Sequence, residues 1–323
     1  MAYEIPKTIL GRTGLTVTRL GSGGAYCESV DGYRKAIDAG INYMDTARSY
    51  RDGEDEKVIG AAIKGQRDRL ILATKTAQRD SKGARTELET SLGMLGVDYI
   101  DIYQLHHLNT QAERDQALAP GGALEMARKA RDEGLIRFIG VTGHDWVEIQ
   151  HAVATGHFDT VLCWYNCAMK TPEDTVFPAA DKHNTGVVIM NASRNDRLFG
   201  DVDAPSPEQF YRYVLSHKSV NLTIMGLRDV ERFHRIAEAL SEREALTPEE
   251  QADSVILERA MNRTTTSPSV CSRSILRRTR PGECHKAFIP LIHATCIIAH
   301  QLPIYFFKLH TVCATIHVSV MRK

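Results

Sequence analysis

Apolar runs and amphipathic stretches alternate along most of this chain. The runs typical of strands are INYMDTA, LILATKT, IDIYQLHH, IRFIGVTG, TVLCWYN, GVVIMNAS and NLTIMGL, with a shorter one at residues 18–22. Helix-like segments such as EDEKVIGAAIKG and ARTELETSLGMLG lie between them. Such alternation predicts parallel strands joined by crossover helices. The continuously apolar strands LILAT and GVVIM indicate a sheet that is buried on both faces.

Eight such strands in roughly 240 residues predict an α/β fold, a closed (β/α)8 TIM barrel, for which about 250 residues are typical. The opening run KTILGRTGLTVTRLG predicts an N-terminal β-hairpin before the barrel. A doubly wound open sheet is the competing architecture, and it needs a glycine-rich phosphate loop after its first strand. Gly21, Gly23 and Gly24 hint at that loop, but the segment YCESVDGY after them is too irregular, so we interpret these glycines as a turn.

The overall composition excludes several kinds of partner. The 323 residues are 43% hydrophobic and carry a formal net charge of zero, which gives no argument for a nucleic-acid partner or a membrane surface. The N-terminus lacks a basic region followed by a long apolar run, so we expect a cytoplasmic protein. Seven cysteines without CxxC spacing predict neither a zinc site nor a redox dithiol.

The charge changes abruptly near residue 262. Residues 263–323 contain nine Lys or Arg and one acidic residue, whereas residues 1–262 hold 31 basic and 39 acidic side chains. We therefore predict a barrel over residues 1–262 and an atypical, basic and apolar tail over 263–323, poorly ordered and not an independent domain. The apolar stretch 287–307 is interrupted by prolines and histidines, which argues against a membrane span. An altered reading frame that replaced an ordinary C-terminal segment is another hypothesis for the tail.

Polar side chains stand at the ends of three consecutive predicted strands. Asp45 ends the second strand, with Tyr50 in the loop after it, Lys75 ends the third and His106 the fourth. Taken alone, each residue has an ordinary structural explanation. The aspartate could cap a helix, the lysine could extend its charged end to solvent, the histidine could belong to the core, and the tyrosine could simply pack against its neighbours. Because the carboxyl ends of all barrel strands meet at one mouth, their coincidence there predicts a catalytic site.

The set of side chains fits proton transfer to a carbonyl group. Tyrosine titrates near 10, and a nearby ammonium such as that of Lys75 lowers this value. Asp45 can hold Lys75 charged, and His106 can orient a substrate oxygen. We expect no metal, because His106 and the adjacent His107 would face opposite sides of a strand. Hydride from a cofactor is then the best partner for the proton.

These motifs resemble the aldo-keto reductases. The resemblance runs from LGRTGLTVTRLG through AIDAGINYMDTARSY, LILATKT and VDYIDIYQLHH to YVLSHKSVNLTIMGLRDVE, roughly residues 5–245. It implies a barrel that uses NADPH, with NADH possible, and no metal. It also implies that Tyr50 is the general acid or base, that Lys75 and Asp45 tune it, and that His106 orients the carbonyl.

The resemblance also implies a set of cofactor-binding positions, some with unusual residues. Thr142 and Gly143 stand where many members have Ser-Asn, Leu162 replaces a glutamine, and Asn191 replaces a stacking tyrosine. Gly226 and Arg228 lie in the expected phosphate-binding turn, where a guanidinium can grip a 2′-phosphate. His107 stands where many relatives have tryptophan, which predicts a more polar substrate pocket. The candidate cofactor residues are Gly23, Thr142, Gly143, Asn166, Asn191, Gly226 and Arg228.

The sequence therefore predicts an NAD(P)H-dependent oxidoreductase that interconverts aldehydes or ketones and alcohols. Its partner is a small carbonyl or alcohol substrate, while the identity of that substrate and the oligomeric state stay open. Two alternatives are a non-catalytic barrel that binds a nicotinamide cofactor as a sensor, and a lyase that forms a Schiff base at Lys75.

Overall fold

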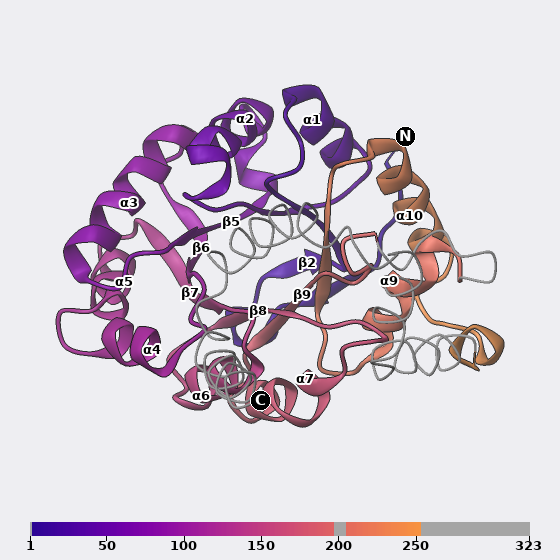
Figure 1. Ribbon diagram of the computed structural model, residues 1–323. Helices are drawn as coiled ribbons and strands as arrows, with labels where there is room; N and C mark the ends of the chain where they lie inside the picture. Colours follow the sequence, from indigo (N-terminus) through magenta and orange to yellow (C-terminus); the bar gives the residue numbers. More distant parts are fainter. Residues whose placement is uncertain (1, 197–204, 253–323) are drawn as a thin grey trace, which may run out of the picture. The chain divides into compact units, whose positions relative to one another are not determined.

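Eight parallel strands close into a barrel in the computed structural model, which describes residues 2–196 and 205–252 (Figure 1). Each strand pairs in parallel with its neighbour, and β10 pairs with β3 to complete the ring. The predicted (β/α)8 barrel is confirmed, and the open doubly wound sheet is excluded by this closure. The strands are β3 (Leu20–Gly23), β4 (Tyr43–Asp45), β5 (Ile71–Thr76), β6 (Ile100–Leu105), β7 (Ile136–Thr142), β8 (Thr160–Trp164), β9 (Gly186–Met190) and β10 (Leu222–Gly226).

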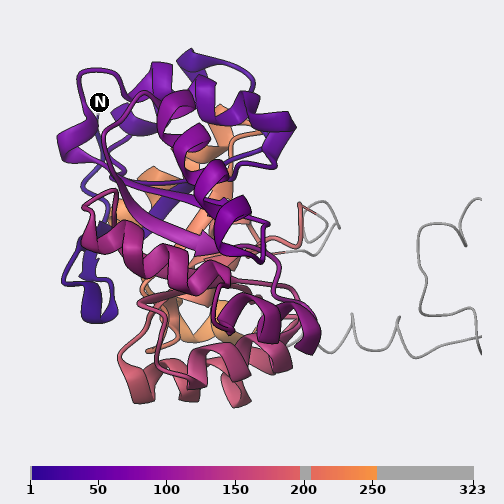
Figure 2. The ribbon, with the colours of Figure 1, turned by 90° about the vertical axis from the view of Figure 1, so that its left-hand side faces the viewer.

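Helices surround the strands, as the view turned by 90° also shows (Figure 2). Several begin where a Ser, Thr or Asp side chain accepts a hydrogen bond from a first-turn N–H, as Asp80 does from Gly83 and Asp145 from Val147. The helices are α1 (Val30–Asp38), α2 (Glu54–Ile63), α3 (Ser81–Leu95), α4 (Gln111–Leu118), α5 (Ala123–Asp132), α6 (Trp146–Ala154), α7 (Thr171–Asp174), α8 (Val176–His183), α9 (Pro207–Ser216) and α10 (Val230–Glu242), with 3-10 turns η1 (Gly11–Thr13), η2 (Tyr50–Gly53) and η3 (Arg67–Arg69).

The predicted N-terminal hairpin is confirmed as β1 (Lys7–Ile9) paired antiparallel with β2 (Thr16–Thr18). Its apolar side chains, including Leu10 and Val17, belong to the same buried cluster as the residues inside the barrel. Arg12 in η1 donates from Nε to Asp159 at 2.8 Å. Because Asp159 directly precedes β8, the hairpin closes the end of the barrel at which the strands begin.

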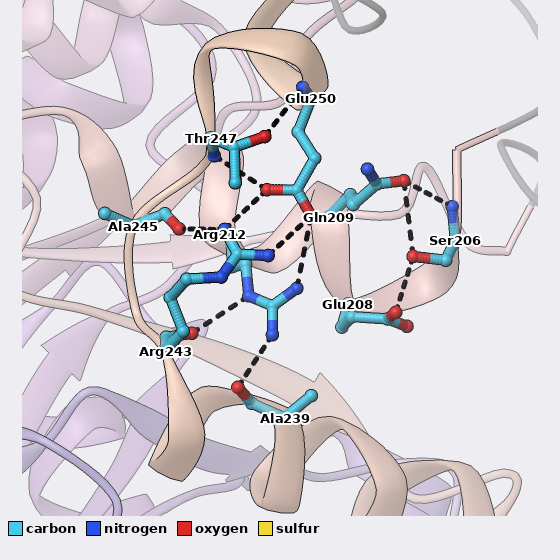
Figure 3. Close-up of polar contacts among 9 residues, drawn as sticks. All are labelled: Ser206, Glu208, Gln209, Arg212, Ala239, Arg243, Ala245, Thr247 and Glu250. Atoms are coloured by element: carbon cyan, nitrogen blue, oxygen red, sulfur yellow. Dashed lines mark hydrogen bonds and ion pairs between the residues drawn. The ribbon is translucent and has the colours of Figure 1, made fainter.

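An arginine–glutamate network anchors the last described residues to α9 and α10 (Figure 3). Arg243 donates two hydrogen bonds to the Glu250 carboxylate, at 2.6 and 2.7 Å. Arg212 on α9 donates to the backbone oxygens of Ala239 and Arg243, at 2.8 and 2.9 Å. Thr247 and Glu250 exchange backbone–side chain bonds in the manner of a capping box, since the Thr247 N–H also reaches the Glu250 carboxylate.

A further helical segment covers residues 248–252, where the described part of the chain ends. The domain boundary near residue 262, the tail and its apolar stretch lie outside the described residues and stay predictions. Within residues 2–196 and 205–252, no helix is both long and apolar enough to cross a membrane.

Candidate active site

The mouth of the barrel brings together the four side chains predicted from the strand ends. Asp45 is the last residue of β4, Lys75 lies near the end of β5, and His106 follows β6 directly. Tyr50 begins η2, in the loop between β4 and α2. Parallel pairing of the three strands places their ends side by side, which explains why residues 61 positions apart in the chain share one site.

Lys75 is the centre of this group. Its Nζ donates to Asp45 Oδ1 at 2.5 Å, to the Thr46 carbonyl oxygen at 2.7 Å and to Tyr50 Oη at 3.4 Å. The ammonium has three protons, and three acceptors surround it. Asp45 and Lys75 are each 1% exposed, so this is a buried ion pair whose remaining polar atoms are also bonded.

Gln104 completes the support of Asp45, because its Nε2 donates to Asp45 Oδ2 at 2.8 Å. Gln104 was not among the site residues predicted from the sequence. Its position two residues before His106 on a strand was the available signal, since residues i and i+2 point to the same face.

Burial determines how these groups titrate. Burial lowers the pKa of Lys75, but the charge of Asp45 and the Tyr50 phenol outweigh it, and the net pKa is raised. Burial raises the pKa of Tyr50 above its ordinary value, although Lys75 acts in the opposite direction. The predicted net lowering of the Tyr50 pKa is therefore wrong, because desolvation of the phenolate exceeds the stabilisation by the ammonium.

His106 lies against both Tyr50 and His107. Its ring meets that of Tyr50 edge-on, with centroids 5.8 Å apart, and stacks on that of His107 at 3.6 Å. The expectation that the two histidines face opposite sides is wrong. The strand ends at Leu105, and His107 takes a left-handed φ of 56°, which folds its ring onto that of His106. His106 is 3% exposed, and its Nδ1 is buried without a partner among the described residues.

The loop that carries Tyr50 is held by buried carboxylates at the start of α2. Thr74 donates to Glu56 Oε1 at 2.7 Å, and the other Glu56 oxygen pairs with Arg48. The Arg48 guanidinium lies against Gly53, where an added Cβ would be 1.1 Å from Nη2. Only glycine fits there, and its φ of 88° is also in the left-handed region. The turn after Tyr50 is therefore fixed by contacts rather than left to a free loop.

A cavity of about 280 Å³ opens beside these residues at the C-terminal ends of the strands. Asp45 and Tyr50 line it, whereas Lys75 and His106 lie behind its surface. Of the predicted cofactor positions, the cavity is lined by Gly23, Asn191, Gly226 and Arg228. Further lining residues, which were not predicted as site residues, include Tyr26, Trp164, Met190, Ser193, Asn195, Asp196 and Tyr211.

Three predicted cofactor positions are not brought to the cavity wall. Thr142 is 1% exposed inside the end of β7, and Gly143 is packed against Ile149 and Leu108. Asn166 is fully buried, and it donates from Nδ2 to the Asn191 carbonyl oxygen at 3.0 Å. Its amide thus braces the loop that carries Asn191.

A sequence model of the Aldo/keto reductase family matches residues 19–204, more than half of the chain. The chain belongs to this family. It is 33% identical over 216 residues to the aldo-keto reductase YhdN of Bacillus subtilis (strain 168), covering 60% of this chain and 63% of that protein. The chain thus spans less than two thirds of the length of this relative.

Two further relatives cover more of the fold. L-galactose dehydrogenase of Arabidopsis thaliana is 25% identical over 296 residues, covering 75% of this chain and 90% of that protein. The crystal structure of an aldo-keto reductase from Klebsiella pneumoniae in complex with NADPH superposes with a TM-score of 0.66. It is 26% identical and covers 80% of this chain and 95% of that one.

In this aldo/keto reductase, the turn after β10 packs against the ring of Tyr26. The Arg228 guanidinium lies 4.0 Å from the centroid of the Tyr26 ring. A Cβ at Gly226 would lie 2.3 Å from Tyr26 Cδ2, so the ring covers the glycine closely. This contact could not be predicted from the sequence, because Tyr26 and Gly226 are 200 positions apart and no local pattern links them.

The far side of the reductase cavity is formed by the segment after β9. Asn191 has a left-handed φ of 68°, and its Oδ1 is buried with no partner among the described residues. Ser193 and Asp196 bond to each other at 3.0 Å, and Asp196 pairs with Arg232 at 3.1 Å. Asn191 therefore presents an unused amide acceptor at the cavity, while Asp196 is already neutralised. Among the described residues, no group of three His, Cys, Asp or Glu side chains is placed to hold a metal ion.

Proposed function

We propose that this reductase interconverts aldehydes or ketones and alcohols, with Tyr50 as the proton donor and NADPH as the hydride source. The observation that carries the proposal is the buried Lys75 ammonium between Asp45 and Tyr50. It places a fixed positive charge 3.4 Å from the one phenol oxygen of this set that lines the cavity.

Tyr50 is suited to give its proton to a carbonyl oxygen. Its raised pKa keeps the phenol protonated at neutral pH. A hydride that reaches the carbonyl carbon would leave an alkoxide, which is a stronger base than a phenolate and takes the proton. The product is the neutral alcohol, and the phenolate left behind is stabilised by Lys75. In the reverse direction the Tyr50 phenolate takes the alcohol proton.

His106 contributes as a neutral group. Burial, then the Lys75 charge, drives the pKa of this imidazole far below its usual range, so it carries no charge at neutral pH. A neutral imidazole retains one N–H donor, which can orient a carbonyl oxygen without competing with Tyr50 as the acid.

The residues that line the cavity suit a nicotinamide dinucleotide, which would supply the hydride. Asn191 Oδ1 is a buried acceptor that needs a donor such as an amide N–H. Gly23 and Gly226 line the cavity without a side chain, and Arg228 at its edge is suited to a 2′-phosphate. The Klebsiella pneumoniae relative, whose structure was solved with NADPH, supports NADPH as the first choice, and NADH is the alternative.

Two alternative functions are weaker. A Schiff base at Lys75 needs a neutral amine with a free lone pair. The three protons of the Lys75 ammonium face three acceptors, and the raised pKa of Lys75 keeps the side chain charged. No observation among the described residues favours a non-catalytic barrel that only binds the cofactor. The experiment below would detect it as cofactor binding without turnover.

The test is NADPH oxidation by the full chain with a panel of aldehydes, compared between the unaltered protein and Tyr50→Phe. We expect turnover in the first and a loss of about 10²–10⁴-fold in the variant, because general acid catalysis contributes about that much. NADPH affinity, measured by fluorescence quenching, is the control that should stay unchanged. Equal turnover in both proteins would contradict the role of Tyr50, and cofactor binding without any turnover would favour the non-catalytic barrel.

A further inference from the structure

A row of aromatic rings in contact runs along one side of the cavity, from the end of β6 to the end of β8. The His106 ring stacks on His107, and His107 meets His144 edge-on with centroids 4.9 Å apart. His144 in turn stacks on Trp164 at 4.4 Å. His107, His144 and Trp164 line the cavity, and we call these three the imidazole wall.

The two imidazoles of the wall have unused hydrogen-bonding nitrogens. Among the described residues, neither ring makes a hydrogen bond, and only the backbones are engaged. Arg79 donates to the His107 carbonyl oxygen at 2.9 Å, and the His144 N–H donates to Asn109 Oδ1 at 2.6 Å. These backbone bonds fix where the rings lie, so the ring nitrogens are available to a molecule in the cavity.

Both rings are uncharged at neutral pH. Burial, then His144 and Lys75, lowers the pKa of His107 to about 4, and burial lowers the pKa of His144. A neutral imidazole offers one donor and one acceptor. A carboxylate could use only the donor and would meet a lone pair at the other nitrogen. A hydroxyl group can accept a hydrogen bond from the donor nitrogen of a neutral imidazole or donate one to its acceptor nitrogen.

We propose that His107 and His144 select carbonyl substrates that carry hydroxyl groups on the carbons next to the carbonyl. The inference rests on the proposed function, in which Tyr50 binds the carbonyl oxygen. The wall begins beside that point, because His107 stacks on His106 and the His106 ring lies 5.8 Å from that of Tyr50. An aldehyde without hydroxyl groups would displace water from the half-buried His107 ring without replacing its hydrogen bonds, which disfavours its binding.

The conformation of His107 supports a role in binding. A non-glycine residue with a φ of 56° is strained, and such strain persists only where the surrounding contacts enforce it. Here it turns the ring onto His106 and along the cavity. An extended backbone at this position would not place the two rings together.

The experiment compares kcat/KM for glyceraldehyde and propanal, which have the same three-carbon chain, with rates normalised to free carbonyl. The proteins are the unaltered chain, His107→Phe and His144→Phe, with His157→Phe as the matched control. His157 is exposed, and it precedes β8 at the opposite end of the barrel. We expect the unaltered protein to prefer glyceraldehyde roughly tenfold or more, about the value of one hydrogen bond. The preference should fall at least about fivefold in either wall variant and persist in the control.

Several results would overturn the inference. One is equal kcat/KM for the two aldehydes in the unaltered protein, and another is a preference that survives both wall variants. A third is a preference for 2-oxobutanoate over butanone that is lost in the same variants, because it would show that the imidazole wall binds a carboxylate group instead of a hydroxyl group. If propanal is reduced as fast as glyceraldehyde, only this inference is contradicted. If no aldehyde is reduced, both the proposed function and this inference are contradicted. His144 is exposed, so its variant should fold even if His107→Phe does not.

Discussion

The Lys75 ammonium is the charge that most directly lowers the pKa of Tyr50, against the effect of burial. We predict that Lys75→Met raises the Tyr50 pKa further, because a positive charge 3.4 Å from the phenol oxygen is lost. In the proposed mechanism Tyr50 must lose its proton before alcohol oxidation, so we expect activity to rise with pH. The rise should therefore move to higher pH in the variant, by about one unit or more. The measurement is kcat/KM for alcohol oxidation as a function of pH.

The Lys75 variant leaves Asp45 buried without its partner, which destabilises the fold. The double variant Asp45→Asn with Lys75→Met removes both charges and keeps the test interpretable. An unchanged pH profile in both variants would contradict the role of Lys75.

Gly226 lines the part of the cavity that we propose binds the cofactor. In Gly226→Ala, the new Cβ would lie 2.3 Å from Tyr26 Cδ2, so the Tyr26 ring must leave its place beside Arg228. We expect NADPH to bind roughly tenfold more weakly, as for the loss of one charged contact. Fluorescence titration measures the Kd.

Gly93→Ala is the control for this substitution. Gly93 is exposed within α3, and nothing lies within 4 Å of its added Cβ. The Kd should stay the same, and the free energy of unfolding should rise by about 0.5–1 kcal/mol. Unchanged NADPH affinity in Gly226→Ala would show that the Tyr26 contact does not shape the cofactor site.

Among the elements, the network around Glu250 joins residues 247–252 to α9 and α10 (Figure 3). Hydrogen bonds from Arg243 and from the Thr247 N–H lower the pKa of Glu250 to about 2. A carboxyl group whose pKa is lower in the folded than in the unfolded protein stabilises the fold. This stabilisation is complete when the pH is above the unfolded pKa, near 4.5, and it is lost as the pH falls toward 2. We predict that Glu250→Gln lowers the free energy of unfolding by about 1–2 kcal/mol at pH 7.

Urea unfolding at pH 7 and near pH 2.5 tests this prediction. The difference between Glu250→Gln and the unaltered chain should shrink at the lower pH. Glu249→Gln is the matched control, because the Glu249 side chain is exposed. A difference that is the same at both pH values would contradict the ionic origin of the effect.

At the scale of the whole barrel, Asp101 ties strands together at the end opposite the cavity. Its carboxylate is 1% exposed and bonds Arg67 at 2.8 Å, Arg137 at 2.6 Å and the Leu72 N–H at 3.0 Å. Asp101→Asn leaves two arginines without their carboxylate. We expect the free energy of unfolding to fall by about 1–3 kcal/mol, because charged hydrogen bonds to a buried carboxylate are lost, whereas the partly exposed arginines keep contact with water.

Denaturant unfolding together with steady-state kinetics checks the Asp101 prediction. KM for aldehyde should not change, because Asp101 lies near the start of β6, whereas the cavity lies beyond the strand ends. Asp132→Asn is the control at an exposed position. A change in KM without loss of stability would contradict a purely structural role.

Much of the barrel and of the group of polar side chains at its mouth could be predicted from the chain alone. The apolar periodicity identifies the strands, and each strand end is a local feature of the sequence. Parallel barrel strands all end at one mouth, so Asp45, Lys75 and His106 had to meet there once the alternation was recognised. Tyr50 was predicted to lie beside them because it follows Asp45 by five residues, in the loop after the second strand.

The tertiary structure decided the features that depend on packing between distant segments. Burial set the direction of the Tyr50 pKa shift, and no local pattern reports how deeply a loop tyrosine is covered. The left-handed backbone at His107 stacked two histidines that a continuous strand would have separated. Asn166 braces the Asn191 loop instead of lining the cavity. The sequence determined which chemical groups reach the barrel mouth, because periodicity and strand ends are local. Only the fold decided their charge, contacts and exposure, because these depend on side chains that lie far away along the chain.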